Sequence, residues 1–253
     1  MEHIILLTVI VLIAALLQTS TGYGFSIIGT PFLLLIYPAH MAIQVNIILS
    51  ICLSAFMIYN IRHEVDLNLL IKLIKGSLLG LIAGIFVYLY LDIQLLKISV
   101  GALIILLTIF LLAKFTVNQS TTKDYLAGGL SGLLTTSIGV PGPPLLLYFT
   151  GANIAPTVLR STTLAYYLFV YSASLAMQIS FGGTNKATWI GALIALPALF
   201  IGIVLGQLFF KWISQQTFRI ITYIILIFTG IYLFSSDKYL GCNHVKSSID
   251  VQG

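Results

Sequence analysis

Long apolar segments, each close to the length of a membrane-spanning helix, alternate with short polar gaps along this 253-residue chain. Only 8% of the residues are charged and 59% are apolar, against about 25% charged in soluble domains. Because so few polar groups cannot cover a water-facing surface, the sequence predicts an integral membrane protein. At about 20 residues per span, the length allows roughly eight spans and no additional soluble domain.

The polar gaps divide the chain into predicted spanning helices and two shorter apolar pieces. The spanning helices are predicted at residues 3–20, 39–60, 67–90, 93–114, 122–136, 155–180, 186–212 and 215–235. The short pieces, 27–37 and 144–150, cannot cross a bilayer alone, so we predict half-helices or re-entrant segments there. The predicted fold class is therefore an all-α polytopic membrane protein.

The chain also shows an internal repeat, with residues 1–115 and 116–237 as the predicted repeats and 238–253 as a flexible polar tail. At an offset of 122 residues, Gly80 falls on Gly202 and Gly84 on Gly206. The loop regions before the short pieces correspond at an offset of 113, which implies a small insertion. The repeat predicts a pseudo-symmetric, transporter-like bundle, and the sequence leaves open whether the halves are parallel or inverted.

Stretches rich in glycine, serine and threonine precede both short pieces. At membrane depth such backbone must be buried in protein or line a wet cavity. Half-helices starting there would direct unpaired N–H groups and a positive dipole end at the loops, which favours an anion. The alternative is that these glycines serve packing and the hydroxyls bond to their own helices. The candidate substrate-binding residues of the two loops are Thr19, Ser20, Thr21, Gly22, Tyr23, Gly24, Ser26, Thr135, Thr136, Ser137, Gly139 and Gly142.

Four more candidates lie on the helices that follow these loops. Arg160 is near the start of a predicted helix, where its guanidinium could grip an oxyanion with two hydrogen bonds, and Thr162 is close by. The alternative for Arg160 is an interfacial anchor that reaches lipid headgroups. The comparable stretch of the first half offers Gln44 and Asn46, which could also bond between helices.

The remaining polar residues exclude several function classes. All seven acidic residues fall in or beside the polar gaps, which disfavours a carboxylate-based cation site or proton relay. Histidine and cysteine lack partners at ligand spacing, so no metal and no cofactor is predicted. No base accompanies a nucleophile, so an enzyme is not expected. Scattered basic residues favour lipid contact over nucleic acid. The expected partners are a small anion and membrane lipid, with a homo-oligomer left open.

Several motifs occur in a particular order along the chain. They are the glycine-rich stretch before Pro31, Gly128-Gly-Leu-Ser-Gly132, Ile138-Gly-Val-Pro-Gly-Pro-Pro-Leu145, Arg160-Ser-Thr162, Gly202-Ile-Val-Leu-Gly206, Phe218-Arg219 and Gly230. From about Leu17 to Phe234 the chain resembles the sulfite exporter TauE/SafE family. The resemblance implies a permease of the plasma membrane or bacterial inner membrane. Its implied substrates are small sulfur-containing or organic anions, such as sulfite, sulfoacetate or related sulfonates.

Two departures from the family pattern concern the loops. The first loop reads Gly22-Tyr-Gly-Phe-Ser-Ile-Ile-Gly29, where family members often carry a denser glycine run. In the second loop, Val140-Pro141 replaces what is often glycine. The resemblance therefore implies a pocket that is narrower or bulkier than usual.

Our leading hypothesis is an anion permease in which the two broken-helix loops meet near the midplane and Arg160 assists binding. Movement of one half against the other would alternate access to this site. No ATP-binding motif is present, so gradients or a partner would drive transport. Two alternatives stay open: a non-transporting membrane subunit or scaffold, and a cation-coupled small-solute carrier.

Overall fold

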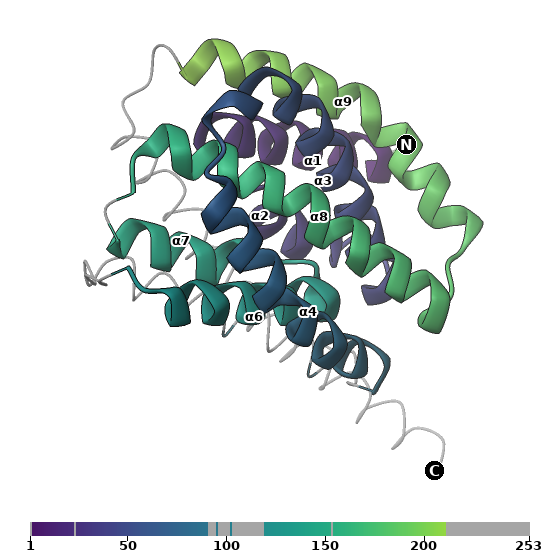
Figure 1. Cartoon of the computed structure of the whole chain (residues 1–253). Coiled ribbons are helices and arrows are strands. Elements are labelled where there is room, and N and C mark those ends of the chain that lie inside the picture. Colours follow the sequence, from purple (N-terminus) through teal and green to yellow (C-terminus); the bar gives the residue numbers. More distant parts are fainter. Residues whose placement is uncertain are drawn as a thin grey trace.

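The computed structural model describes residues 2–22, 24–90, 95, 102, 119–152 and 154–210, and every element within them is helical (Figure 1). The long helices are α1 (Glu2–Thr21), α3 (Ala39–Ile61), α4 (Leu67–Tyr90), α6 (Thr121–Ile138), α8 (Pro156–Gly182) and α9 (Lys186–Phe210). The short helices are α2 (Phe25–Leu33) and α7 (Gly142–Gly151), and the 3-10 turn η1 (Arg62–Glu64) joins α3 to α4. The predicted helix at 215–235, almost all of the one at 93–114 and the tail at 238–253 lie outside the described residues.

Four helices are long and apolar enough to cross a membrane. Their spans are Ala39–Tyr59, Leu67–Tyr90, Thr157–Gly182 and Lys186–Leu208. Each has at least 21 residues, which covers about 30 Å of hydrocarbon. The all-helical membrane architecture is thus confirmed for the described part of the chain. The apolar stretch of α1, Ile4–Ser20, is shorter, and the total of eight spans stays a prediction.

Helices α4 and α6 pack backbone against backbone. A Cβ atom added at Gly80 would overlap the backbone of Gly129, and one added at Gly84 would meet the carbonyl oxygen of Leu133. Small residues allow this close approach, on which helix association in a membrane depends. Because residue numbers rise together along the contact, the two helices run parallel.

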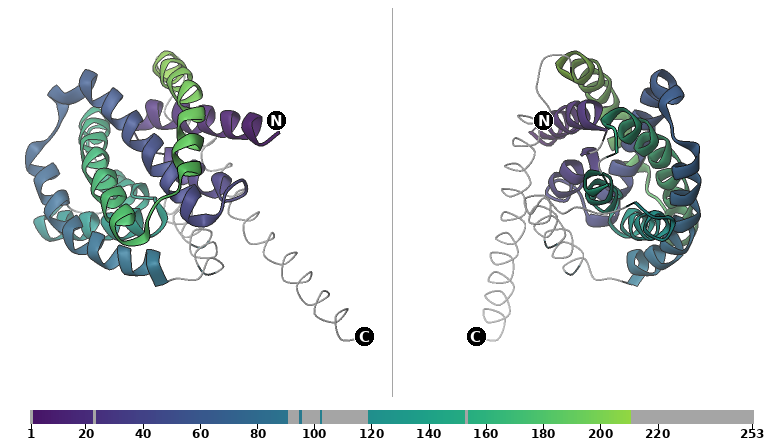
Figure 2. Two further views of the ribbon diagram at one scale, coloured as in Figure 1. Left: turned by 90° about the vertical axis from the view of Figure 1, so that its right-hand side faces the viewer. Right: turned by 60° about the vertical axis from the view of Figure 1, so that its left-hand side comes forward.

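Helices α1 and α9 form a second pair of the same kind. A Cβ atom added at Gly202 would lie 2.7 Å from the carbonyl oxygen of Leu12, and one at Gly206 would lie 2.8 Å from that of Leu16. These helices also run parallel. Two further views show α9 lying against α1 and α6 lying along α4 (Figure 2).

Helices α3 and α8 run antiparallel through the middle of the bundle. Near the start of α8, the Ser161 hydroxyl donates to the carbonyl oxygen of Glu64, which follows α3. Near the start of α3, the Gln44 amide donates to the carbonyl oxygen of Gly183, which follows α8. Short connections reverse the chain from α3 to α4 and from α8 to α9. Therefore α1, α3 and α9 run in one direction, and α4, α6 and α8 run in the other.

Candidate functional site

The first break separates α1 from α2. Gly22 and Gly24 have φ angles of 84° and 125°, a region that side chains with a Cβ rarely enter. The Gln18 side chain closes the turn, because its Oε1 accepts a hydrogen bond from the first helical N–H of α2, at Phe25, over 3.0 Å. Gly22 lies directly on Arg160, whose Cα would be 2.9 Å from an added Cβ. The Gln18 hydrogen bond and the close contact with Arg160 thus hold this interruption in place.

The second break separates α6 from α7. Gly139 caps α6 with a φ of 75°, and its N–H donates to the carbonyl oxygen of Thr135 over 2.8 Å. The Asn46 side chain, from α3, donates through Nδ2 to the carbonyl oxygen of Gly139 over 2.9 Å. The Ser131 hydroxyl donates to the carbonyl oxygen of Pro141 over 2.8 Å. Neutral side chains therefore satisfy the backbone of this interruption.

The two short helices begin next to each other inside the protein. A Cβ atom added at Gly142, the first residue of α7, would lie 3.3 Å from Ile27 Cδ1 on α2 and 2.9 Å from the Tyr167 hydroxyl. Asn46, which bonds to the second break, also contacts the middle of α2, since its Oδ1 would be 2.8 Å from a Cβ added at Gly29. The residues at this meeting point are buried. The structure thus brings both breaks to one place in the core.

Most of the hydroxyls predicted for the site already have partners. Ser20, Thr135 and Ser137 donate to the carbonyl oxygen four residues earlier in their own helices, at 2.8, 2.6 and 2.7 Å. The Thr136 hydroxyl pairs with that of Ser174 on α8 at 2.9 Å.

Two other loop hydroxyls have different surroundings. The Ser26 hydroxyl accepts from that of Tyr171 over 2.8 Å. Thr19 is fully buried, and its hydroxyl has no hydrogen-bond partner among the described residues. Tyr23 and the side chain of Thr21 lie outside the described part of the chain.

Arg160 lies beside the first break. Its Nη2 donates to the carbonyl oxygen of Thr19 over 2.6 Å. This carbonyl belongs to the last turn of α1, where carbonyl groups lack helical partners and the helix dipole is negative. Arg160 therefore acts as a charged cap on α1 in this structure, and it holds the broken end in place.

Thr162 and Gln44 form hydrogen bonds with groups outside the two breaks. Thr162 Oγ1 accepts from the backbone N–H of Asp66, just before α4, over 3.0 Å. Gln44 bonds to the turn between α8 and α9, because its Oε1 accepts from the Thr184 hydroxyl over 3.1 Å. The two side chains contact opposite ends of the bundle.

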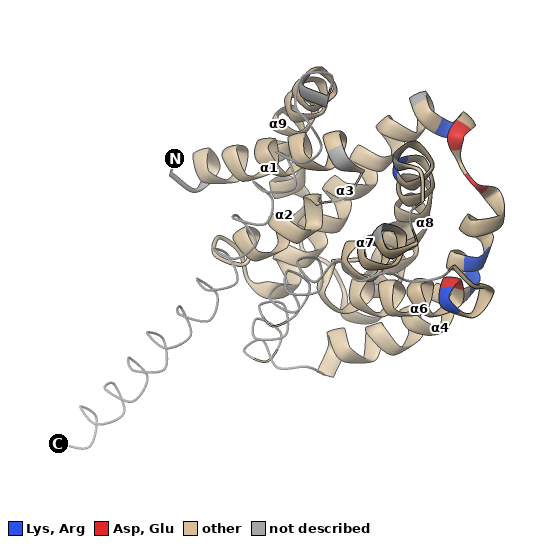
Figure 3. Cartoon of the chain, turned by 90° about the vertical axis from the view of Figure 1, so that its left-hand side faces the viewer, with Lys and Arg blue, Asp and Glu red and all other residues tan. Residues whose placement is uncertain are grey.

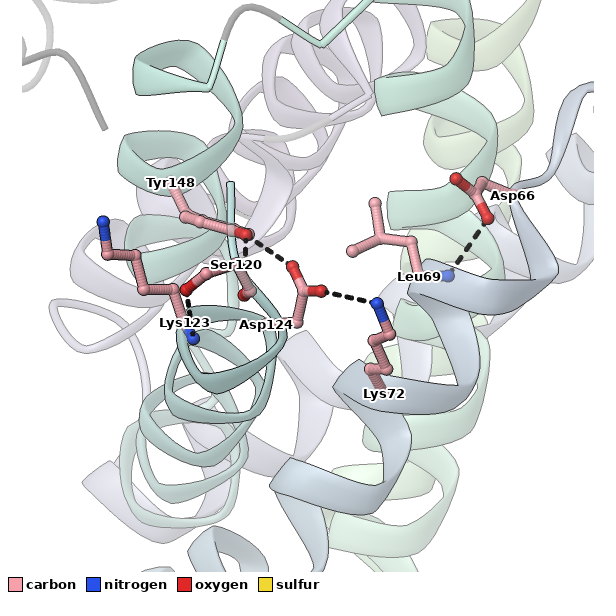
Figure 4. A network of polar contacts seen from close by, with 7 residues as sticks. All are labelled: Asp66, Leu69, Lys72, Ser120, Lys123, Asp124 and Tyr148. Carbon is pink, nitrogen blue, oxygen red and sulfur yellow. Dashed lines mark hydrogen bonds and ion pairs between the residues drawn. The ribbon is translucent and has the colours of Figure 1, made fainter. Parts of the chain in front are cut away.

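A buried carboxylate, expected in or beside a polar gap, lies in the first turn of α6. The Asp124 side chain is only 1% exposed, and its Oδ2 is 3.1 Å from Lys72 Nζ on α4. The Tyr148 hydroxyl on α7 donates to the other carboxylate oxygen (Figure 4). Asp124 thereby ties α4, α6 and α7 together. Its position in the first turn of a predicted helix, where an acid is favourable, was the available signal.

Most of the described charged residues lie at one end of the bundle, where α3 turns into α4 and α6 begins (Figure 3). This end includes Arg62, Lys72, Lys75 and Lys123. No group of three or more histidine, cysteine, aspartate or glutamate residues that could hold a metal ion is found within the described ranges. The polar groups that the described residues bring to the breaks are amides, hydroxyls and the guanidinium of Arg160.

Apolar spanning helices around two helices that break at glycine, within a buried polar core, form the architecture of a multi-pass membrane transporter. The sequence model of the sulfite exporter TauE/SafE family matches residues 7–233, and the chain belongs to this family. The protein is thus a multi-pass transporter of the cell membrane and not an enzyme.

One curated relative is similar over most of its length. It is the "Probable sulfite/organosulfonate exporter TauE" of Cupriavidus necator, which is 25% identical over 221 residues, covering 84% of this chain and 86% of the relative. No solved structure shows a significant match to this chain.

Proposed function

We propose that the protein transports small sulfur-containing anions, sulfite or organosulfonates, through a site between the two breaks. The observation that carries this proposal is the position of Gly142 of α7 against Ile27 of α2, which brings two helix N-termini together in the core. Helix N-termini attract anions through free N–H groups and the dipole. The name of the Cupriavidus necator relative supports the substrate class.

The same proposal includes two inverted repeats. Gly22 and Gly139, the left-handed residues of the two breaks, are 117 residues apart, as are the first residues of α3 and α8. This register differs from the offset of 113, because Pro31 lies inside α2 whereas Pro144 lies in the first turn of α7. The opposite directions of α1 and α6 support an inverted relation. Each broken helix would then pair with the long glycine helix of the other repeat.

Alternating access follows from this pairing. The α1–α9 pair and the α4–α6 pair are each held by backbone contacts, so each would move as a unit. A shift of one pair against the other would open the breaks to one side of the membrane and then to the other. We assign the end rich in lysine and arginine to the cytoplasm, since basic residues accumulate on that side.

The test is transport by the purified protein in liposomes. We expect flux of sulfite and of methanesulfonate that empty liposomes lack. Gly142→Val would place a side chain at the meeting point of α2 and α7, and we expect it to abolish flux. Gly129→Ala is the matched control, because a Cβ there meets only the Gly76 carbonyl oxygen, at 3.4 Å. Absence of wild-type flux for both anions would refute the proposal.

Two further arms of this experiment test coupling. Flux is measured with and without a sodium gradient, and with and without a proton gradient. Transport of methanesulfonate that responds to neither gradient, but follows the gradient of the anion itself, would identify a uniporter. A response to one gradient identifies the coupling ion.

A further inference from the structure

Gln18 has a buried hydrogen-bonding group that no part of the described protein satisfies. The residue is 0% exposed. Its Oε1 accepts from the Phe25 N–H over 3.0 Å, which holds the carboxamide at the N-terminus of α2. The Nε2 of the same carboxamide is buried and has no hydrogen-bond partner among the described residues. A buried donor without an acceptor is unfavourable, so such groups usually have a ligand or water as a partner.

The two short helices differ in the donors that they can offer. In α2, Ser26 and Ile27 follow Phe25, and the first-turn N–H groups of a helix have no helical acceptor. In α7, the corresponding positions are Pro143 and Pro144, which have no N–H. Only α2 therefore presents consecutive backbone donors, and Gln18 Nε2 lies at that same end.

We infer that Gln18 Nε2 and the N–H groups of Ser26 and Ile27 bind the oxygen atoms of a singly charged oxyanion, such as a sulfonate. This inference rests on the proposed function. The oxygens of a sulfonate only accept hydrogen bonds, and these three groups only donate. The α7 side of the site contributes contact through Gly142 and the two prolines.

The electrostatics of the first break favour one negative charge over two. A helix N-terminus supplies the equivalent of about half a positive charge. The Gln18 carboxamide is neutral, and the full positive charge of Arg160 lies at the C-terminal end of α1, whose dipole supplies about half a negative charge. These contributions sum to about one positive charge, which a single negative charge balances and a double charge exceeds. A dianion would therefore lose more hydration energy than these groups restore. Sulfonates, which carry one charge at neutral pH, match the site better than sulfate does.

Gln18→Glu separates binding from a structural role. A glutamate oxygen can still accept from the Phe25 N–H, and a carboxylate is favourable at a helix N-terminus. A purely structural Gln18 therefore predicts a stable variant that binds anions normally. In our inference the variant is equally stable but repels the ligand, because the carboxylate replaces a donor by a negative acceptor. Gln18→Met removes the donor without adding charge, and it also removes the Oε1 acceptor of the Phe25 N–H, so its affinity is interpreted together with its thermal stability.

The experiment measures binding of methanesulfonate and of sulfate to the full-length purified protein in detergent, by calorimetry and by thermal stabilisation. We expect methanesulfonate affinity to fall at least about tenfold in Gln18→Met and further in Gln18→Glu. Gln207→Glu is the matched control, because Gln207 Nε2 on α9 donates to Met57 Sδ on α3 and takes no part in the proposed site. That variant should bind as wild type does.

The outcomes distinguish the inference from the proposed function. Wild-type protein that neither binds nor transports any of these anions would refute both. Wild-type binding that persists in Gln18→Glu and Gln18→Met would refute only the role of Gln18. Sulfate binding as tight as that of methanesulfonate would refute the preference for a single charge. If Gln18→Glu does not fold, Gln18→Met decides through both affinity and thermal unfolding: weaker binding by a variant as stable as wild type supports the role of Gln18, and unchanged binding refutes it.

Discussion

The two breaks use the same backbone geometry with different side chains. Both turn at a glycine with positive φ, at Gly22 and Gly139. The last turn of α1 is capped by the guanidinium of Arg160, whereas the carbonyl oxygen of Gly139 is satisfied by the neutral amide of Asn46. The start of α2 offers N–H groups, and the start of α7 is largely proline. The difference teaches that two breaks with the same backbone geometry can offer different chemical groups to their surroundings.

The same comparison explains which residues can be exchanged. At each break the backbone conformation requires glycine, because only glycine takes a positive φ at low cost while it lies against a neighbouring helix. The caps are less restricted, since any donor of suitable length can satisfy a carbonyl group. Specificity can therefore differ between the halves without a change of fold.

The largest effect is expected where α4 meets α6. Gly80→Ala would force a methyl group into the Gly129 backbone, so we expect a loss of about 3 kcal/mol or more. Gly202→Ala should cost less, because its Cβ would meet the Ala15 methyl and the Leu12 carbonyl at 2.7 Å. Thermal unfolding in detergent measures both. Equal losses would show that the two helix pairs are equally tight.

The Asp124 network should produce the next largest effect. Asp124→Asn removes the charge that faces Lys72, and we expect a loss of about 2 kcal/mol. This is below the usual cost of breaking a buried ion pair because the Lys72 side chain is 31% exposed. In the proposed repeat register of 117 residues, the position that corresponds to Asp124 is the buried Leu7. An apolar residue should therefore fit here, and the double variant Asp124→Leu/Lys72→Met should recover most of the stability that the single variants lose.

The recovery is measured against the single variants in the same unfolding assay. Asp124→Leu alone leaves the Lys72 ammonium without its carboxylate. Lys72→Met alone leaves a buried carboxylate that still accepts from the Tyr148 hydroxyl but has lost its cation. Losses that simply add in the double variant would contradict a specific interaction between the two charges.

Substitution of the two turn glycines gives a smaller effect that differs between the breaks. Positive φ alone costs alanine about 1–2 kcal/mol. At Gly22 the new methyl group would also lie 2.9 Å from Arg160 Cα, whereas at Gly139 its nearest neighbours are at 3.3 Å. We therefore expect Gly22→Ala to be the more destabilising variant in thermal unfolding. The reverse order would contradict the close contact between Gly22 and Arg160.

The sequence was sufficient to locate the breaks, because glycine and proline mark interruptions by their own backbone chemistry. The short helices are close to the predicted pieces, although α2 (Phe25–Leu33) begins and ends a few residues earlier than the predicted piece 27–37. The partners of polar side chains were not predictable, since they depend on tertiary packing. Thr162 was predicted as a site residue because it is close to Arg160 in the sequence, but its hydroxyl accepts from the Asp66 N–H. Gln18 was missed because a single amide at the end of an apolar helix has no distinctive pattern.

The smallest effect is expected at Pro144, and it tests the comparison directly. Pro144→Ala gives α7 an N–H donor that it lacks, at the cost of about 0.5 kcal/mol of stability from greater freedom of the unfolded chain. If the sulfonate oxygens lie against α2, the new donor has no anion to bind and methanesulfonate affinity should not change. Calorimetric titration of the variant beside wild type measures this. Tighter binding would mean that both helix N-termini face the anion. It would then be wrong that α2 supplies the hydrogen-bond donors and α7 supplies only contact.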